Sequence, residues 1–112
     1  MADNAEPLVL INLFSMPKEV VDRFIDGWEN STAAAKDAKG FRGTRLHRSL
    51  DPDAEFPVVN IARWDSVEEW QEAVGRYFSA PAKGDRGPVS AKPGLYTVVH
   101  VTPDPRESAV HG

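Results

Sequence analysis

Two asparagines and a tryptophan stand in otherwise apolar segments, where their N–H groups could stabilise negative charge on an oxygen atom. Asn60 and Trp64 belong to the apolar run Val58–Trp64. Asn12 interrupts a second apolar run, Leu8–Ser15. Burying such a polar group without a partner costs about 1–3 kcal/mol, so each of them needs a hydrogen bond. The partner can be a neighbouring turn or loop, or a bound ligand, and the residues alone leave both open.

The spacing of these residues bears on what they could bind. Asn60 and Trp64 are four residues apart, so on a strand they point to the same face, roughly 13 Å from each other. This separation suits the two ends of one polycyclic ligand. A core residue that fills one end of the domain is an equally good interpretation of Trp64. Trp28 and Trp70 lie on helical apolar stripes, where a tryptophan is a core residue or a pocket wall.

Other side chains could move protons. His47 and His100 are candidate general bases, because histidine exchanges a proton near neutral pH, although a lone histidine is more often a plain hydrogen-bonded side chain. The hydroxyl groups of Tyr77 and Tyr96 are candidate proton donors. No metal site is predicted, since the histidines lack a second ligand at metal-binding spacing and the chain has no cysteine. Phosphate-binding and hydrolase motifs do not occur.

Length and composition point to one ordinary globular domain. The chain has 112 residues, of which 41% are hydrophobic and 27% are charged. The formal net charge of −4 disfavours nucleic acid and anionic membranes as partners. No segment approaches the roughly 20 apolar residues of a membrane span, and the first residues lack the pattern of a signal peptide. We therefore expect a cytoplasmic protein.

Hydrophobic periodicity predicts four strands and two helices. A helix over residues 18–38 follows from apolar residues every three or four positions, and Gly40 would end it. A second helix begins after Ser66, which forms a capping box with Glu69. The expected strands are Leu8–Ser15, residues 41–50, Val58–Trp64 and residues 94–102. Residues 79–93 read as a long loop and a candidate lid.

The resulting order, βαββαβ, is that of the ferredoxin-like α+β fold. Right-handed crossovers give a four-stranded antiparallel sheet with the first and third strands in the centre and both helices on one face. We expect this domain to span residues 8–102, between an N-terminal tail of residues 1–7 and a mobile tail of residues 103–112. The helix-free face is too apolar to face water, which predicts a homodimer.

Three stretches of the sequence resemble the antibiotic-biosynthesis monooxygenase family. These are residues 11–17, the Gly-Phe pair in residues 40–43, and residues 59–66, where a strand ends in Trp, an acidic residue and Ser. The resemblance implies a dimeric α+β barrel with one pocket per subunit. Some members oxidise phenolic polyketides to quinones with O₂ and no cofactor, and others degrade haem. By position, Asn60 and Trp64 match pocket residues of the quinone-forming members, and Asn12 and Trp64 match pocket residues of the haem-degrading branch.

Two departures from the family pattern matter. Trp70 stands where quinone-forming members have a tyrosine, which removes a phenolic proton donor. No histidine occurs between His47 and His100, which disfavours haem degradation. The resemblance thus predicts a cofactor-independent monooxygenase for a small aromatic, polyketide-like molecule and O₂, with Asn60 and Trp64 catalytic. The predicted substrate-binding residues are Asn12, Trp28, Trp70, Tyr77, Tyr96 and His47. A polyketide cyclase or isomerase using the same pocket, or a non-catalytic accessory binding domain, are the alternatives.

Overall fold

The structure, a computed structural model, describes residues 8–77 and 88–106, without the side chains of Ala34, Arg76 and Tyr77. The strands are β1 (Leu8–Ser15), β2 (Phe41–Arg48), β3 (Val58–Trp64) and β4 (Ser90–Tyr96). The helices are α1 (Lys18–Asp26), α2 (Trp28–Thr32), the 3₁₀ helix η2 (Ala33–Asp37) and α3 (Val67–Tyr77).

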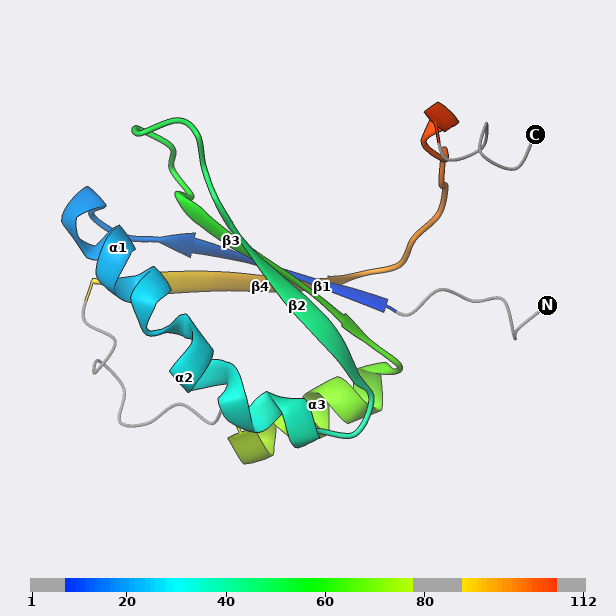
Figure 1. The fold of residues 1–112 in the computed structure, drawn as a ribbon. Helices are drawn as coiled ribbons and strands as arrows, with labels where there is room; N and C mark the ends of the chain where they lie inside the picture. The colour runs from blue at the N-terminus through cyan, green and yellow to red at the C-terminus, as the bar shows by residue number, and fades with distance from the viewer. Residues whose placement is uncertain (1–7, 78–87, 107–112) are drawn as a thin grey trace.

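The strands form one antiparallel sheet in the order β2-β3-β1-β4, and the helices lie together on one face of it (Figure 1). The apolar strands β1 and β3 are central, as near-continuous apolar runs require. This arrangement confirms the ferredoxin-like α+β fold. Within the described ranges, no helix is both long enough and apolar enough to cross a membrane.

The first predicted helix is not continuous. It stops at Asp26, and Gly27, the weakest helix former after proline, separates α1 from α2. The Ser31 and Thr32 hydroxyls donate to the Trp28 carbonyl, at 2.9 and 3.0 Å, and such back-bonding bends a helix. The prediction of one helix over residues 18–38 is therefore wrong.

Strand β2 contains a bulge that decides which side chains face the helices. The pairing register with β3 shifts between Phe41 and Thr44. Gly43 lies between them with a φ of +104°, which glycine adopts without strain. Because the bulge adds one residue, Phe41 and Thr44 both point to the helix-covered face.

At the junction between β3 and α3, the described residues form one of the two backbone N–H bonds of the predicted capping box, the bond from Glu69 to Ser66. The Glu69 backbone N–H donates to the Ser66 hydroxyl at 3.1 Å, and this hydroxyl donates to the Glu69 carboxylate at 3.0 Å. Gly40, with a φ of +86°, lies so close to Glu69 that a Cβ there would stand 2.3 Å from the carboxylate. The capping box and Gly40 together fix where α3 leaves the sheet.

The last strand differs from the prediction. It covers Ser90–Tyr96 and not residues 94–102. Its Pro93 is tolerated because β4 is an edge strand, where a missing N–H breaks no ladder bond on the outer side. Of the predicted loop 79–93, residues 79–87 lie outside the described part of the chain, and residues 90–93 belong to β4. Beyond Tyr96 the chain leaves the sheet as an arm, residues 97–106 (Figure 1); residues 1–7 and 107–112 of the predicted tails are not described.

Candidate functional site

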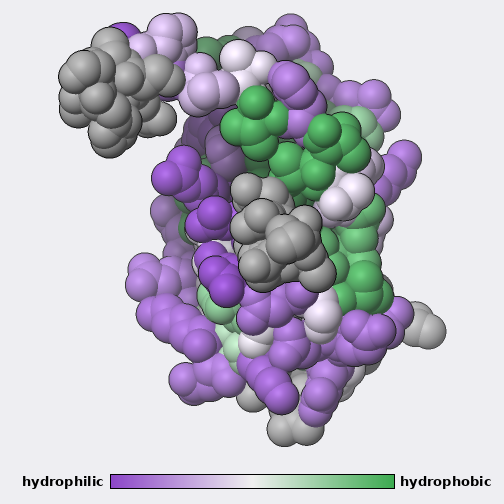
Figure 2. All heavy atoms as spheres, turned by 90° about the vertical axis from the view of Figure 1, so that its right-hand side faces the viewer, coloured by the Kyte–Doolittle hydropathy of each residue, from purple (hydrophilic) through white to green (hydrophobic). Residues whose placement is uncertain are grey.

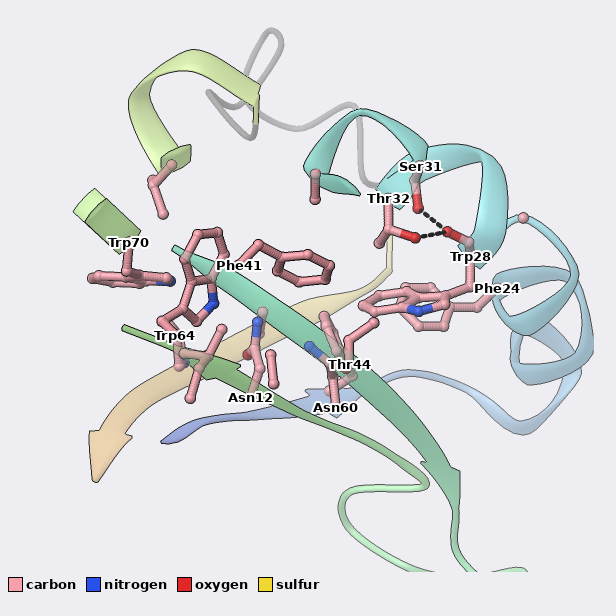
Figure 3. Close-up of a pocket in the computed structure, with 18 of the residues that line it drawn as sticks. Asn12, Phe24, Trp28, Ser31, Thr32, Phe41, Thr44, Asn60, Trp64 and Trp70 are labelled. Carbon is pink, nitrogen blue, oxygen red and sulfur yellow. Dashed lines mark hydrogen bonds between the residues drawn. The ribbon is translucent and has the colours of Figure 1, made fainter. Parts of the chain in front are cut away.

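A cavity of about 750 Å³ lies between the sheet and the helices (Figure 3). Its size is that of a typical site for a small molecule of several rings. Most of its lining is apolar or aromatic. The lining residues are Leu10, Asn12, Phe14, Arg23, Phe24, Gly27, Trp28, Ser31, Thr32, Ala35, Phe41, Thr44, Asn60, Ala62, Trp64, Trp70, Val74, Ala91 and Pro93.

Aromatic side chains close the two ends of the cavity. At one end, the Phe14 ring lies 4.9 Å from the Phe24 ring and 5.8 Å from Trp28, measured between centroids. At the other end, the rings of Phe41 and Trp64 meet at 5.2 Å in an edge-on contact. Trp70 packs against this second cluster. A flat ligand would therefore meet ring faces and edges at both ends.

Two amides occupy the floor between these ends. Asn12 of β1 and Asn60 of β3 are directly paired in register, so their side chains stand side by side on the same face. Asn60 is only 6% exposed. Its carbonyl oxygen accepts a hydrogen bond from the Thr44 hydroxyl on β2. This bond fixes the Asn60 amide and leaves its NH₂ group as the donor that the cavity can use.

Two buried polar atoms in the lining have no hydrogen-bond partner in the part of the chain that the structure describes. They are the Asn12 Oδ1 atom and the Trp64 Nε1 atom. One is an acceptor and the other is a donor. Both groups lie on the same side of the cavity in Figure 3. Buried polar atoms are rarely left unpaired, so a ligand or an ordered water that supplies one donor and one acceptor would complete the site.

The cavity opens between the helices and β4. Among its lining residues, the solvent-exposed ones are Arg23, Gly27 and Ser31 on the helix side and Ala91 and Pro93 on the sheet side. The remaining lining residues are buried or half-buried. This distribution of exposure identifies the mouth of the cavity within the described ranges.

The structure brings together five of the residues that the sequence singles out. Asn12, Trp28, Asn60, Trp64 and Trp70 all line the one cavity. The predicted alternation of β3 accounts for Asn60 and Trp64, which both point to the helix-covered face.

Three other predicted residues are not brought there. One is His100, which is exposed beyond β4 with its Nε2 atom 2.8 Å from the Thr102 hydroxyl. His47 pairs with Val59, and Tyr96 pairs with Val9, so both lie on the helix-free face of the sheet. Tyr96 is 56% exposed and packs against Gly94. Neither side chain lines the cavity, because strand alternation turns it to the opposite side. The side chain of Tyr77 lies outside what the structure describes.

Sequence reasoning missed several lining residues. Thr44 could be placed on the correct face by alternation, but its bond to Asn60 depends on the register of β2 against β3. Phe41 is turned inward only by the bulge at Gly43. Phe24 fits the apolar periodicity of the helix predicted over residues 18–38, but periodicity alone does not link it to a pocket. Arg23 is a charged residue in the same segment, and nothing in the local pattern marks it as a lining residue.

The described lining offers hydrogen-bond donors but no ready base. It contains one charged side chain, Arg23, and neither a carboxylate nor an imidazole. No cluster of three or more potential metal ligands occurs among the described residues. The arrangement can therefore hold a flat molecule, exclude water, and polarise an oxygen atom through the Asn60 amide and the Trp64 indole.

This fold and site define a small α+β domain with a cavity lined mostly by apolar and aromatic side chains. The family model for antibiotic biosynthesis monooxygenase matches residues 7–77. The chain therefore belongs to this family. No curated protein matches the sequence.

Solved structures agree with this assignment. A protein of Shewanella loihica PV-4, designated a candidate monooxygenase, is 28% identical, with a TM-score of 0.73 over 87% of this chain and 98% of that one. SnoaB of Streptomyces nogalater, a cofactor-independent oxygenase, is 21% identical, with a TM-score of 0.67 over 89% of this chain and 100% of that one. The haem degrader MhuD of Mycobacterium tuberculosis, with two haems bound in its active site, is 23% identical, with a TM-score of 0.68 over 87% of this chain and 100% of that one. The last two show the shared fold alone. The family assignment supports a monooxygenase-like function.

Proposed function

We propose that this protein is a cofactor-independent monooxygenase that oxidises a flat, hydroxylated aromatic molecule of polyketide type with O₂. The observation that carries the proposal is a pair of buried polar atoms, Asn12 Oδ1 and Trp64 Nε1, that have no partner among the described residues and lie in a cavity with mostly apolar walls. A phenol hydroxyl can donate to the first, and a ring carbonyl or phenolate oxygen can accept from the second.

The reaction balances without a cofactor. An anthrone carbon that bears two hydrogens becomes a quinone carbonyl, which is a four-electron oxidation. One oxygen atom of O₂ enters this carbonyl, and the other leaves as water with the two hydrogens. The substrate therefore supplies all four electrons that O₂ takes up, and no external reductant is needed.

The protein's contribution is to make the substrate's anion accessible. Loss of one proton from the anthrone gives an enolate, whose negative charge lies largely on the oxygen atom. The Asn60 NH₂ group and the Trp64 indole N–H are fixed donors that stabilise this charge, and the apolar walls strengthen the interaction by excluding water. Since the described lining has no base, the proton would leave to water at the mouth.

The cavity disfavours haem as the substrate in this account. An iron porphyrin needs an axial ligand, and histidine commonly provides one. None of the described lining residues is a histidine, and His47 lies on the other face of the sheet. A cyclase or isomerase would use the same donors on a carbonyl of the same ligand, so it is distinguished by its independence of O₂.

Oxygen uptake tests the proposed reaction. Dihydroxyanthrone is added to the protein in an oxygen electrode, and uptake is compared with the uncatalysed oxidation in buffer. The proposal predicts protein-dependent uptake, one O₂ per quinone formed, and one labelled atom in the quinone when isotopically labelled O₂ is used. Conversion of a substrate under strict anaerobiosis would indicate a cyclase or isomerase. Tight binding with neither uptake nor conversion would leave an accessory binding domain.

We further propose that the protein works as a homodimer that covers the helix-free face of the sheet. Val9, Ile11 and Leu13 of β1 and Val59 and Ile61 of β3 alternate onto this face and are only half-buried in the single chain. Figure 2 shows hydrophobic side chains gathered on one side of the surface. Burial of such a face against a second copy is the ordinary way to remove it from water.

The arm after β4 supports the same proposal. Val99 and Val101 are 88% and 63% exposed although valine favours strands and burial. A second copy would offer them a partner surface. The expected result is a dimer by light scattering at micromolar concentration, and a monomer there would refute it.

A further inference from the structure

Among the described residues, the mouth of the cavity carries a single charge. Arg23 is the one charged side chain among the described lining residues. It lies on α1, one helical turn before Gly27 and two before Ser31, and all three face the same opening. Because Gly27 has no side chain, nothing from that position stands between the guanidinium and the cavity.

Arg23 has no ion-pair partner within the described ranges. The carboxylate of its neighbour Asp22 is taken by Arg48 at 2.5 Å, and the other arginine pairs are Arg42 with Asp65 and Arg106 with Asp104. A guanidinium that is exposed at a cavity mouth and unpaired can bind a carboxylate through two parallel hydrogen bonds.

The polar groups of the cavity therefore change in character from its interior to its mouth. The interior has neutral hydrogen-bonding groups, from Asn12, Asn60 and Trp64, and the mouth has a positive charge. A matching ligand has neutral hydroxyl and carbonyl oxygens on its buried rings and a negative group at the end that faces solvent. One guanidinium matches the single charge of a carboxylate, whereas a phosphate dianion would call for further donors.

We propose that Arg23 is a specificity-determining residue that selects aromatic substrates carrying a carboxylate at the mouth of the cavity. This inference rests on the proposed function, since it concerns the substrate of the same site. The inference specifies the charged end of the substrate, which the buried residues of the cavity do not determine.

A pair of matched probes tests it. The two are a dihydroxyanthraquinone carboxylic acid and the same dihydroxyanthraquinone without the carboxylate. All three tryptophans of the chain line the cavity, so quenching of their fluorescence reports binding of either probe. The wild type should bind the acid more tightly than the neutral probe. Added salt should weaken acid binding selectively, because it screens an exposed charge pair.

Substitution of Arg23 separates its role from general packing. Arg23→Gln should weaken acid binding by about tenfold and leave the affinity for the neutral probe unchanged. Arg23→Lys should recover part of the loss, because it keeps the charge without the two-pronged geometry. Lys36→Gln, which removes an exposed charge of η2 outside the lining, is the matched control and should bind both probes as the wild type does.

The outcomes are distinct. Equal affinities of the wild type for the two probes, or an equal effect of Arg23→Gln on both, overturn the inference. Absence of binding by the wild type to either probe also overturns it. Failure of the proposed function is recorded separately, as absence of O₂ uptake with dihydroxyanthrone. If Arg23→Gln takes up O₂ as the wild type does with both acid and neutral anthrones, only the role of Arg23 is rejected.

Discussion

The two faces of the sheet are both apolar, but they differ in the polar atoms that accompany their apolar residues. The helix-covered face carries Asn12, Asn60 and Trp64 in the interior of the cavity, where two polar atoms lack partners among the described residues. The helix-free face carries Val9, Ile11 and Ile61 in its centre and exposed charged groups such as Arg45 and Arg63 around them.

This difference indicates different occupants. Unpaired atoms inside a cavity call for a ligand or an ordered water with complementary hydrogen bonding, since apolar contact alone would leave them unsatisfied. A partly exposed apolar centre with a charged border is instead typical of a protein interface, where the polar groups stay at the rim. The following predictions test this assignment of one face to a small molecule and the other to a second copy of the chain.

The largest effect is expected from truncation on the helix-covered face. Trp64 is 1% exposed and packs against Phe41, so Trp64→Ala should lower the free energy of unfolding by about 3–5 kcal/mol. Chemical denaturation measures this loss. Leu50→Ala, at a fully exposed residue, is the control and should change stability by less than about 1 kcal/mol. A loss for Trp64→Ala as small as that of the control would show that this end of the core is not packed.

The next effect concerns the helix-free face. Ile61→Asp places a charge in the centre of the proposed interface and should raise the dissociation constant of the dimer by about 100-fold or more. Analytical ultracentrifugation measures the dimer population, and circular dichroism checks that the fold is kept. Leu50→Asp, far more exposed, should leave the dimer intact. Dimers of equal strength in both variants would contradict the use of this face.

The third prediction concerns a side chain of the cavity. Asn60→Ala removes a donor to the developing oxyanion and should lower kcat for anthrone oxidation by about 100-fold. Thr44→Val keeps the shape of the side chain but frees the Asn60 amide, so a smaller loss is expected from it. The measurement is initial oxygen uptake at saturating dihydroxyanthrone. Unchanged kcat in Asn60→Ala would rule out its proposed role as an oxyanion donor.

The smallest effect is expected from Asn12→Leu, which should raise the stability of the protein but weaken ligand binding. Asn12→Leu removes a buried acceptor without a described partner, so the ligand-free protein should gain about 1 kcal/mol of stability. The same change should weaken binding of dihydroxyanthraquinone, because the ligand hydroxyl loses its acceptor. Thermal unfolding with and without the ligand measures both. A loss of stability without ligand would mean that Asn12 serves the fold itself.

Much of the fold could be predicted because it depends on local patterns. The apolar runs Leu8–Ser15 and Val58–Trp64 match β1 and β3 residue for residue, and Ser66 marks the start of α3. The element order then determines the sheet order, since crossovers have one hand. The shift of β4 from residues 94–102 to Ser90–Tyr96 was missed, because an edge strand needs neither an apolar run nor all its N–H groups.

The site was predictable only in part. Asn60 and Trp64 follow from alternation within a single strand, which is a local property. The bond from Thr44 to Asn60 depends on the register between two strands and on the bulge at Gly43, which no single strand encodes. Arg23 lines the cavity from α1, which the apolar pattern of this helix does not predict. Contacts between elements therefore account for what the sequence left undetermined.

A crystal structure of the protein with dihydroxyanthraquinone tests the central claim most directly. The account predicts one flat molecule in the cavity, with a hydroxyl within hydrogen-bond distance of Asn12 Oδ1 and a carbonyl oxygen within that distance of Trp64 Nε1. A cavity that excludes the ligand and holds both atoms paired to ordered water, or to the protein itself, would contradict it.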